Sequence, residues 1–194
     1  MVEGLDQLRV LIHSIAPLPE EVWKEFAAAW KPFTASRREV VTEAGKVERY
    51  LYFVLDGVQR VYHFDEQDRE ATIVFTYTPS FGGVLDSFLL QQPSRYYYEA
   101  LTKSTFIRAD FAEIDALMTK YPALCRIIQK GTAVALSGIL ERLVELQSLS
   151  SEEKFRKLLG RSPHILQLVP HKYLANYLGI DATNFSKLLN KVIF

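Results

Sequence analysis

The chain has 194 residues, 48% hydrophobic and 24% charged, which is typical of a soluble globular protein with room for one large or two small domains. Its single cysteine, Cys125, excludes an intrachain disulfide, a cysteine-based metal cluster and an iron–sulfur sensor. No stretch approaches the ~20 apolar residues of a membrane span and the acidic start lacks the form of a signal peptide, so we expect a cytoplasmic protein with no membrane partner.

The formal net charge is zero, but the charges are unevenly placed. From Lys154 onward, seven Lys or Arg residues accompany one acid, Asp181, so this end carries +6 and residues 1–153 carry −6. Such asymmetry is typical of an acidic body with a basic end that faces phosphates. Chance clustering of surface charge is the alternative.

Residues 3–15 and 19–29 have apolar residues at helical spacing, and Pro19 suits the first turn of the second helix. From Trp30 to Asp110, short runs of branched and aromatic residues alternate with turn residues. We predict strands over residues 39–42, 50–55, 58–64, 71–77, 96–101 and 105–108. Their spacing indicates a β-sandwich or a barrel-like roll.

Two turn signals lie between the predicted strands. Asp56-Gly57 predicts a two-residue hairpin of type I′, a turn that needs positive φ at both positions. Residues 65–68 predict a looser, polar turn of the same kind. Residues 79–83 interrupt the strand pattern, and a brief helix is predicted over residues 84–90.

A short helix is predicted over residues 111–120 and a long one over residues 123–149. Apolar residues of the long helix follow a seam of nearly 3.5-residue spacing, formed by Ile128, Leu136, Ile139, Leu143 and Leu146. A helix that is apolar on more than one side needs two partners, which we expect to be the roll and a second copy of the chain. A wholly intramolecular core helix is the alternative.

The C-terminal part begins with a capping-box pattern, Ser150 and Glu153, which predicts a new helix and a domain boundary at this point. Residues 171–190 then predict two short helices joined by a tight turn. Gly179 suits the left-handed end of the first helix, and Asp181 can cap the second. This layout is typical of a DNA-binding helix-turn-helix, whose second helix enters the major groove. An ordinary helical hairpin is the alternative.

The candidate DNA contacts lie on and beside the second of these helices. The outward residues of its first two turns are Thr183, Asn184, Ser186 and Lys187. An Asn side chain can contact adenine through two hydrogen bonds, and a Lys side chain can reach guanine or phosphate. Lys172 and Lys191 are expected to contact phosphates.

In this order of elements the chain resembles the Crp–Fnr superfamily of bacterial transcription regulators over nearly its whole length. The resemblance is carried by Asp56-Gly57, by Phe81-Gly82-Gly83 with Arg95 twelve residues on, and by the run LANYLGIDATNFSKLL that starts at Leu174. It implies an α+β fold with an N-terminal β-roll, a cyclic-nucleotide-binding-like jelly roll with flanking helices, then a long dimerisation helix and a C-terminal helix-turn-helix domain.

The resemblance also implies a function. Residues 1–149 would form an effector-sensing domain that includes the long dimer helix, and residues 150–194 a DNA-binding domain. A cyclic nucleotide or another small anionic effector would bind in the roll and repack the long helices. The homodimer would thereby change the separation of its recognition helices on a palindromic operator in double-stranded DNA, with RNA polymerase as a further partner.

The effector site implied by the resemblance comprises Gly82, Gly83, Asp86, Arg95, Tyr96, Thr132 and Ser137. The family's cyclic-nucleotide binders carry a Glu directly after the glycine to hold the ribose hydroxyl, and this chain has Val84 there. Losing that buried contact should cost on the order of 1–3 kcal/mol, so we expect weak binding of cyclic AMP and either an empty pocket or a different, anionic or aromatic ligand. Alternatively, Arg95 is a surface arginine, and Thr132 and Ser137 bond the backbone of their own helix.

Other classes of function have less support in the sequence. The four histidines, His13, His63, His164 and His171, are scattered, and no nucleophile and base stand at a recognisable spacing. We therefore expect neither a metal site nor an enzyme. A ligand-binding or protein-interaction module of the same fold without specific DNA binding is the main rival to a transcription regulator, and a β-roll enzyme is a second.

Overall fold

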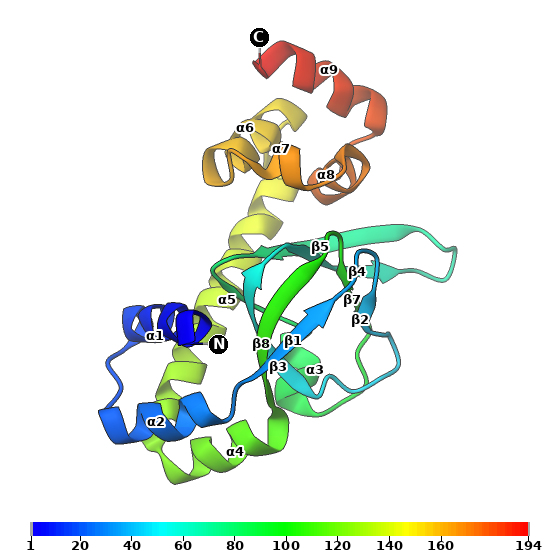
Figure 1. The fold of residues 1–194 in the computed structure, drawn as a ribbon. Helices are drawn as coiled ribbons and strands as arrows, with labels where there is room; N and C mark the ends of the chain where they lie inside the picture. The colour runs from blue at the N-terminus through cyan, green and yellow to red at the C-terminus, as the bar shows by residue number, and fades with distance from the viewer. Residues whose placement is uncertain (1, 194) are drawn as a thin grey trace.

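The structure, a computed structural model, describes residues 2–193, with side chains described as far as Lys191. It consists of a β-roll flanked by helices at one end, a long helix that runs behind the roll, and a cap of short helices at the opposite end (Figure 1). The first two helices, α1 (Val2–Ile15) and α2 (Glu20–Ala28), lie where the sequence predicts them. The α+β fold with a roll, a long helix and C-terminal helices is confirmed.

The described strands form two four-stranded antiparallel sheets. The first sheet has the order β1 (Lys31–Ala35), β8 (Ser104–Asp110), β3 (Tyr50–Asp56) and β6 (Ser80–Gly82). The second has the order β2 (Val40–Thr42), β7 (Tyr97–Ala100), β4 (Val58–Phe64) and β5 (Glu70–Tyr77). Because neighbouring side chains on a strand face opposite ways, Tyr52 and Phe106 fill the space between the sheets while Phe53 and Ile107 face the helices.

The predicted hairpin at Asp56-Gly57 is wrong. β3 and β4, which flank it, lie in different sheets, and only Gly57 has a positive φ, 89°, so the turn is not of type I′. A Cβ atom on Gly57 would lie 2.4 Å from the Ser104 hydroxyl oxygen and 2.6 Å from the Lys103 carbonyl oxygen. The glycine is therefore needed where the chain passes from one sheet to the other and approaches the backbone before β8.

Two strands escaped the sequence prediction. Residues 31–35 form β1, and residues 80–82 form β6, which pairs with Tyr52–Val54 of β3 as an edge strand. The segment 79–83 therefore extends the sheet before the predicted brief helix, α3 (Leu85–Leu90), begins. The polar turn at residues 65–68 does join a hairpin, β4–β5, as predicted, with the Asp65 amide donating to the Arg69 carbonyl over 3.1 Å.

The remaining helices are α4 (Phe111–Lys120), α5 (Pro122–Ser148), α6 (Ser151–Arg161), α7 (Ile165–Leu168), α8 (His171–Leu178) and α9 (Ala182–Ile193), of which α7 was not predicted. Local caps set several of their ends. The capping box of Ser150 and Glu153 forms, Gly179 ends α8 with φ 63°, and Asp181 accepts a hydrogen bond from the Asn184 amide over 2.8 Å.

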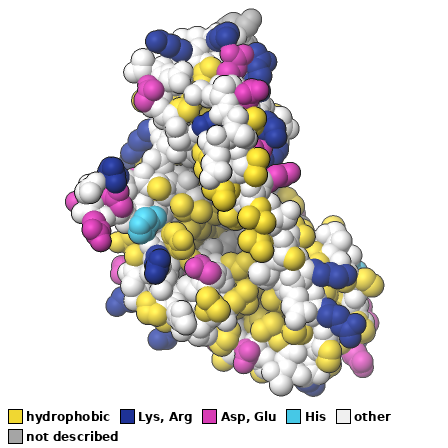
Figure 2. Space-filling view, turned by 180° about the vertical axis from the view of Figure 1, so that it is seen from behind, with side chains coloured by type: hydrophobic (Ala, Val, Ile, Leu, Met, Phe, Trp, Pro, Cys, Tyr) yellow, Lys and Arg dark blue, Asp and Glu magenta, His cyan; other side chains and the backbone are white. Residues whose placement is uncertain are grey.

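The long helix α5 is covered on one side at its start and bare along its second half. Leu124 and Ile127 are buried with residues of α1, α2 and α4, whereas Val134, Leu140 and Val144 are 69%, 53% and 61% exposed. Of the predicted seam residues, Leu136, Ile139, Leu143 and Leu146 are exposed as well, and Ile128 is half-buried. Figure 2, the view from behind, shows hydrophobic side chains gathered in a band along the middle of the molecule.

By length and composition α5 would also suffice for a membrane span, which the sequence analysis did not anticipate. One such helix is weak evidence for a membrane protein. The first part of α5 packs inside the helical core beside the roll, and Arg142 and Glu145 in its last part are buried against the C-terminal helices. The bare apolar residues between these two packed ends need a cover of another kind.

Candidate nucleic-acid interface and sensor site

The two helices at the end of the chain cross around a small apolar core. Leu174, Ala175 and Leu178 of α8 pack with Phe185 and Leu188 of α9, and each of these side chains is 6% exposed or less. The outer side of α9 is left free, and it lies at the end of the molecule farthest from the roll (Figure 1). The predicted DNA contacts Thr183, Ser186 and Lys187 are exposed on this side and Asn184 is half-buried.

Most of the positive charge at this end is already paired within the chain. The carboxylate of Glu145 is buried, and Arg161 and Lys157 approach it to 2.7 and 3.3 Å. The carboxylate of Glu152 is half-buried, and Arg156 and Lys191 approach it to 2.9 and 2.6 Å. Lys154 is buried and donates to the Leu178 carbonyl oxygen over 3.4 Å. Among the described residues of this end, Lys172 and Lys187 are the cations without an ion pair or a burying contact of this kind.

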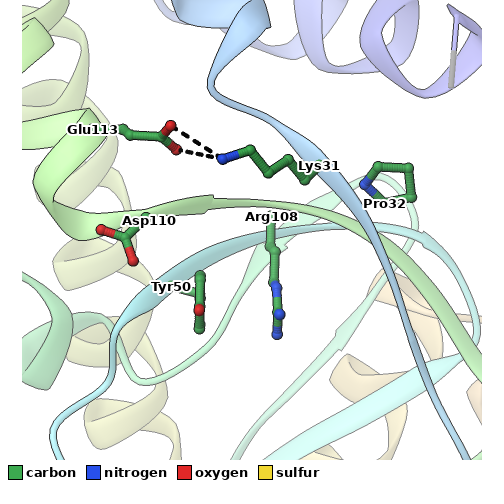
Figure 3. A pocket seen from close by; sticks show the side chains of 6 residues that line it. All are labelled: Lys31, Pro32, Tyr50, Arg108, Asp110 and Glu113. Atoms are coloured by element: carbon green, nitrogen blue, oxygen red, sulfur yellow. Dashed lines mark hydrogen bonds and ion pairs between the residues drawn. The ribbon is translucent and has the colours of Figure 1, made fainter.

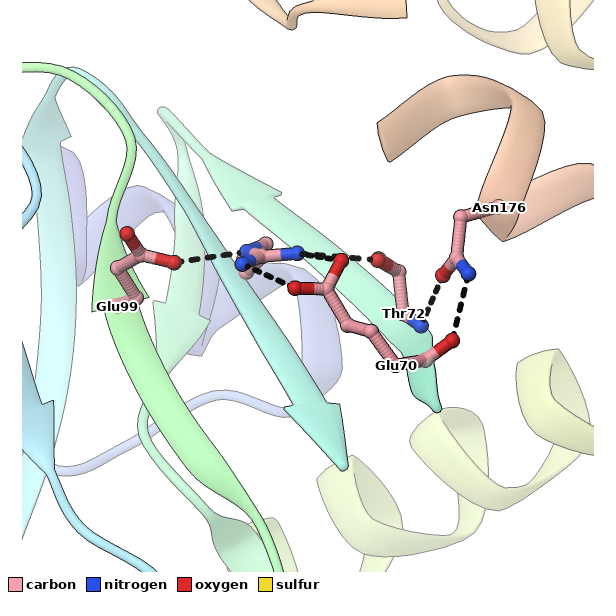
Figure 4. Close-up of polar contacts among 5 residues, drawn as sticks. Glu70, Thr72, Glu99 and Asn176 are labelled. Atoms are coloured by element: carbon pink, nitrogen blue, oxygen red, sulfur yellow. Dashed lines mark hydrogen bonds and ion pairs between the residues drawn. The ribbon is translucent and has the colours of Figure 1, made fainter. Parts of the chain in front are cut away.

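The opposite face of α8 docks on the roll, which the sequence analysis missed. The side-chain amide of Asn176 accepts a hydrogen bond from the Thr72 backbone amide and donates one to the Glu70 carbonyl, each over 2.6 Å (Figure 4). Both partners belong to β5, which is the edge strand of its sheet. Asn176 thus satisfies backbone groups that an edge strand otherwise leaves to water.

A buried arginine lies beside this contact. Arg60 of β4 is 3% exposed, and its guanidinium donates to Glu99 over 2.8 Å and to both oxygens of Glu70 over 2.6 and 3.0 Å. Burial opposes the charge of Arg60, but these carboxylates outweigh it and raise its pKa. The ring of Tyr62 and the ring of Tyr173 from α8 lie 4.0 and 3.8 Å from its Cζ atom, so the arginine joins the roll to the helix-turn-helix.

A third contact brings the long helix to the same place. The ring of Tyr177 on α8 lies 5.1 Å from that of Phe75 on β5 and 3.6 Å from the Cζ atom of Arg142 on α5. Burial lowers the pKa of Arg142. Tyr173, Asn176 and Tyr177 therefore form one face of α8, called here the docking face, which contacts both the roll and α5. Two tyrosines four residues apart on the side of α8 away from its own core were the available sequence signal.

The glycine turn predicted to cradle an effector anion already faces a carboxylate. Glu48 is 2% exposed, and one of its oxygens accepts a hydrogen bond from the Val84 amide over 3.3 Å, at the start of α3. A Cβ atom on Gly83 would lie 3.3 Å from the same oxygen. Burial raises the pKa of Glu48. Hydrogen bonds from Thr42, Tyr50 and Val84 favour the charged form and lower the pKa, but burial has the larger effect. An anion at this turn would compete with the Glu48 carboxyl group for the Val84 amide.

The other predicted effector residues are spread over the roll and the long helix. Arg95 is exposed in the loop before β7, where its carbonyl oxygen accepts a hydrogen bond from His63 Nδ1 over 2.9 Å, and Tyr96 beside it is half-buried. Gly82 lies against the Tyr98 hydroxyl, and Asp86 is exposed on α3. Thr132 donates to the Ile128 carbonyl over 2.9 Å, as its alternative reading has it, and Ser137 is exposed.

Two hollows open instead around Arg108 of β8. The larger, about 580 Å³, is lined by Lys31, Pro32, Tyr50, Arg108, Asp110 and Glu113 (Figure 3). The smaller, about 270 Å³, is lined by residues 40–43 and 46–50, by Tyr52 and by Arg108. Tyr50 and Arg108 therefore line both hollows. None of the predicted effector residues lines either hollow.

Most of the roll is similar to one known protein family. Residues 33–121 match the family described as the cyclic nucleotide-binding domain. This span runs from β1 to the end of α4, and it includes the glycine turn as well as Arg108. No curated protein sequence matches the chain.

Solved structures with the same fold extend over both parts of the chain. FixK2 from Bradyrhizobium japonicum aligns with a TM-score of 0.77 at 16% identity, covering 84% of each chain. The c-di-GMP-responsive global regulator CLP from Xanthomonas campestris aligns with 0.66 at 17% identity, covering 90% of this chain and 91% of that one. A CooA mutant from Carboxydothermus hydrogenoformans aligns with 0.65 at 18% identity, covering 95% and 83%.

Proposed function

We propose that this chain, which carries a cyclic nucleotide-binding domain and has the fold of the Crp–Fnr regulators, is a DNA-binding transcription regulator that works as a homodimer. FixK2, CLP and CooA belong to this group of regulators, and the chain covers most of the length of each. The observation that carries the proposal is the free outer face of α9, held by a helix-turn-helix core and turned away from the roll.

The proposed DNA contacts are Thr183, Asn184, Ser186 and Lys187 on α9, with Lys172 and Lys191 on phosphates. Asn184 lies in the first turn of the helix, the part that contacts base edges in this motif. Lys187 has no ion pair among the described residues and is exposed, so it can approach a phosphate or a guanine without breaking a contact. Lys191 must first leave Glu152.

The bare stripe of α5 supports a homodimer. Seven large hydrophobic side chains between Val134 and Leu146 are 38% to 69% exposed, which is costly for a soluble monomer. Two parallel copies of this stripe would bury each other at a seam with the spacing of a coiled coil. The dimer would then place two copies of α9 at one end of the assembly, as a palindromic operator requires.

The docking face of α8 supports a mechanism in which the roll controls the recognition helix. α8 packs on α9 through Leu174, Ala175 and Leu178 and on β5 through Asn176 and Tyr177. A change in the sheet that holds Arg60 and β5 would therefore move the helix that supports α9. An effector in the roll would act by favouring one arrangement of these contacts over another.

Binding of the purified protein to a randomised duplex library tests the proposal. Lys187→Ala should weaken binding to all sequences alike and shallow the dependence on salt by about one unit per half-site, while Asn184→Ala should relax base preference at one position of each half-site. Lys24→Ala, an exposed lysine of α2, is the matched control and should bind like the wild type.

One observation favours the rival, a module of this fold without specific DNA binding. Five of the seven cations after residue 153 are paired or buried within the chain, which leaves few for phosphates. If the library selection enriches no palindromic site and Lys187→Ala leaves DNA affinity unchanged, the rival is the better account.

A further inference from the structure

We propose that the roll binds a small organic carboxylate through the guanidinium of Arg108, in the hollow of Figure 3, instead of an anion at the turn of Gly83 or at Arg95. The proposal deepens the sensing part of the proposed function and rests on it. It assigns the effector pocket to strands β1, β3 and β8, and it names the class of ligand that these residues fit.

Arg108 points into the roll between two aromatic rings. β8 lies between β1 and β3 in its sheet, and Arg108 faces the same side of β8 as the buried Phe106. Phe33 of β1 and Tyr50 of β3 approach it from the two neighbouring strands, each with its ring centroid 4.0 Å from the Cζ atom of Arg108. Rings at this distance cover the faces of a guanidinium and leave its N–H edge for a hydrogen-bond acceptor in the same plane.

The acids near Arg108 are already engaged. Glu113 accepts from Lys31 over 3.2 Å, and Asp110 accepts from the Ala112 amide over 2.9 Å at the start of α4. Among the described residues, Arg108 makes no ion pair, and its charge and a hydrogen bond act on the Tyr52 hydroxyl, where they oppose the rise in pKa that burial causes. A half-buried guanidinium without an acid loses hydration that aromatic rings and one hydroxyl replace only in part, and a carboxylate that binds it through two parallel hydrogen bonds would replace more of it.

The surroundings select the kind of anion. The hollow is lined by two basic residues, Lys31 and Arg108, and by two acidic residues, Asp110 and Glu113, so its net charge is nearly zero. A ligand with one negative charge therefore fits better than a phosphate monoester with two. Pro32 and the ring of Tyr50 add apolar wall, and a hollow of about 580 Å³ has the size of a small-molecule site. The ligand class is therefore a monocarboxylate with an apolar or aromatic body.

A ligand here has a route to the long helix. Asp110, which lines the hollow, ends β8 and caps α4. α4 in turn packs on α5. Phe111 and Leu117 of α4 lie against the same buried cluster as Leu124 and Ile127 of α5. A carboxylate on Arg108 that draws Asp110 or Lys31 into a new arrangement would therefore act on the end of α5 opposite to the DNA-binding helices.

Calorimetric titration of the full chain with benzoate tests the site, with neutral benzamide, inorganic phosphate and cyclic AMP as comparison ligands. Benzoate should bind and benzamide should not. Arg108→Gln should weaken benzoate binding roughly 10- to 100-fold, since a hydrogen-bonded charge pair is lost. Arg95→Gln is the matched control and should bind benzoate like the wild type. Protection measured on the wild type needs no folded variant: benzoate should slow the modification of Arg108 by phenylglyoxal and leave that of Arg95 unchanged.

The proposal is overturned if benzoate does not bind at millimolar concentration, if Arg108→Gln binds it unchanged, or if phosphate or cyclic AMP binds more tightly than benzoate. DNA binding measured on the same samples separates this proposal from the proposed function. Loss of benzoate binding with DNA binding intact rejects the pocket alone. Benzoate binding through Arg108 in a protein that selects no DNA site rejects the regulator and leaves the pocket.

Discussion

The docking of α8 on the edge strand β5 predicts that the Thr72 amide exchanges with solvent only when the helix-turn-helix lifts from the roll. The Thr72 amide donates to the side chain of Asn176 over 2.6 Å, and no further strand lies beyond β5 in its sheet. Exchange of a hydrogen-bonded amide requires an opening that breaks the bond. The rate at Thr72 therefore reports the free energy of docking.

Tyr173→Leu is the perturbation of choice because it leaves the Asn176–Thr72 bond chemically intact. It removes the ring that lies 3.8 Å from the Cζ atom of Arg60, whose side chain is 3% exposed, and it retains an apolar side chain of moderate size. A cation–π contact that is shielded from water is worth about 2 kcal/mol, of which leucine packing recovers a part. A loss of about 1–2 kcal/mol of docking free energy makes Thr72 exchange roughly 5 to 30 times faster.

Amide exchange followed by NMR measures this rate residue by residue. Tyr173→Phe keeps the ring over Arg60 and should exchange at Thr72 like the wild type. Amides of β4 that bond to β7 lie inside the sheet and should keep their rates in both variants. The reasoning fails if Thr72 exchanges as slowly in Tyr173→Leu as in the wild type, or if the Phe and Leu variants behave alike.

Leu143→Glu places a charge in the bare stripe of α5 and should convert dimers to monomers in sedimentation at micromolar concentration. Leu90→Glu, at the exposed last residue of α3, should stay dimeric, and a monomeric wild type contradicts the dimer. Burial raises the pKa of Glu48 in the folded chain, so the stability linked to this group is greatest below the ordinary carboxyl pKa and falls as pH rises toward the raised value. Glu48→Gln should flatten that fall in urea titrations carried upward from the ordinary carboxyl pKa of about 4, and a parallel pH dependence in both proteins would count against it. Glu152→Gln releases Lys191 and should tighten DNA binding, because Lys191 no longer has to leave an ion pair before it contacts a phosphate; an unchanged affinity means that Lys191 contacts no phosphate.

Elements set by local interactions were predictable from the sequence. The capping box at Ser150 and Glu153 and the turn of Gly179 and Asp181 each satisfy backbone groups within a few residues, so their sequence pattern carries the whole interaction. Gly57 shows the limit of such signals. A glycine at this position correctly predicts a turn. The side chain is excluded, however, by the close approach of Ser104, which lies far along the chain. No local sequence pattern shows that β3 and β4 belong to different sheets.

The docking face and the hollow at Arg108 were not predictable for a related reason. β4 is buried along both faces from Val58 to Tyr62, so it has no alternation that would single out Arg60 as an inward residue. The family resemblance directs attention to Gly83 and Arg95, whose positions rest on sequence spacing. That spacing says nothing of Glu48, which comes from a different strand connection and places its carboxylate at the glycine turn.

Tyr177 is where the three parts of the chain meet, and this position bears on how a signal would travel. Its ring contacts Phe75 of the roll and Arg142 of α5, while its helix carries the core that supports α9. Arg142 is buried, and its Nη1 atom has no hydrogen-bond partner among the described residues, so its place depends on the ring of Tyr177 and the charge of Glu145 nearby. A buried donor without a partner costs free energy, so an arrangement of α5 and α8 that gave Arg142 a partner would be favoured. We infer that rearrangement of α5 on dimerisation and rearrangement of the roll on ligand binding would both act on α9 through the docking face of α8, at which Tyr177 contacts both partners, and therefore on the same equilibrium.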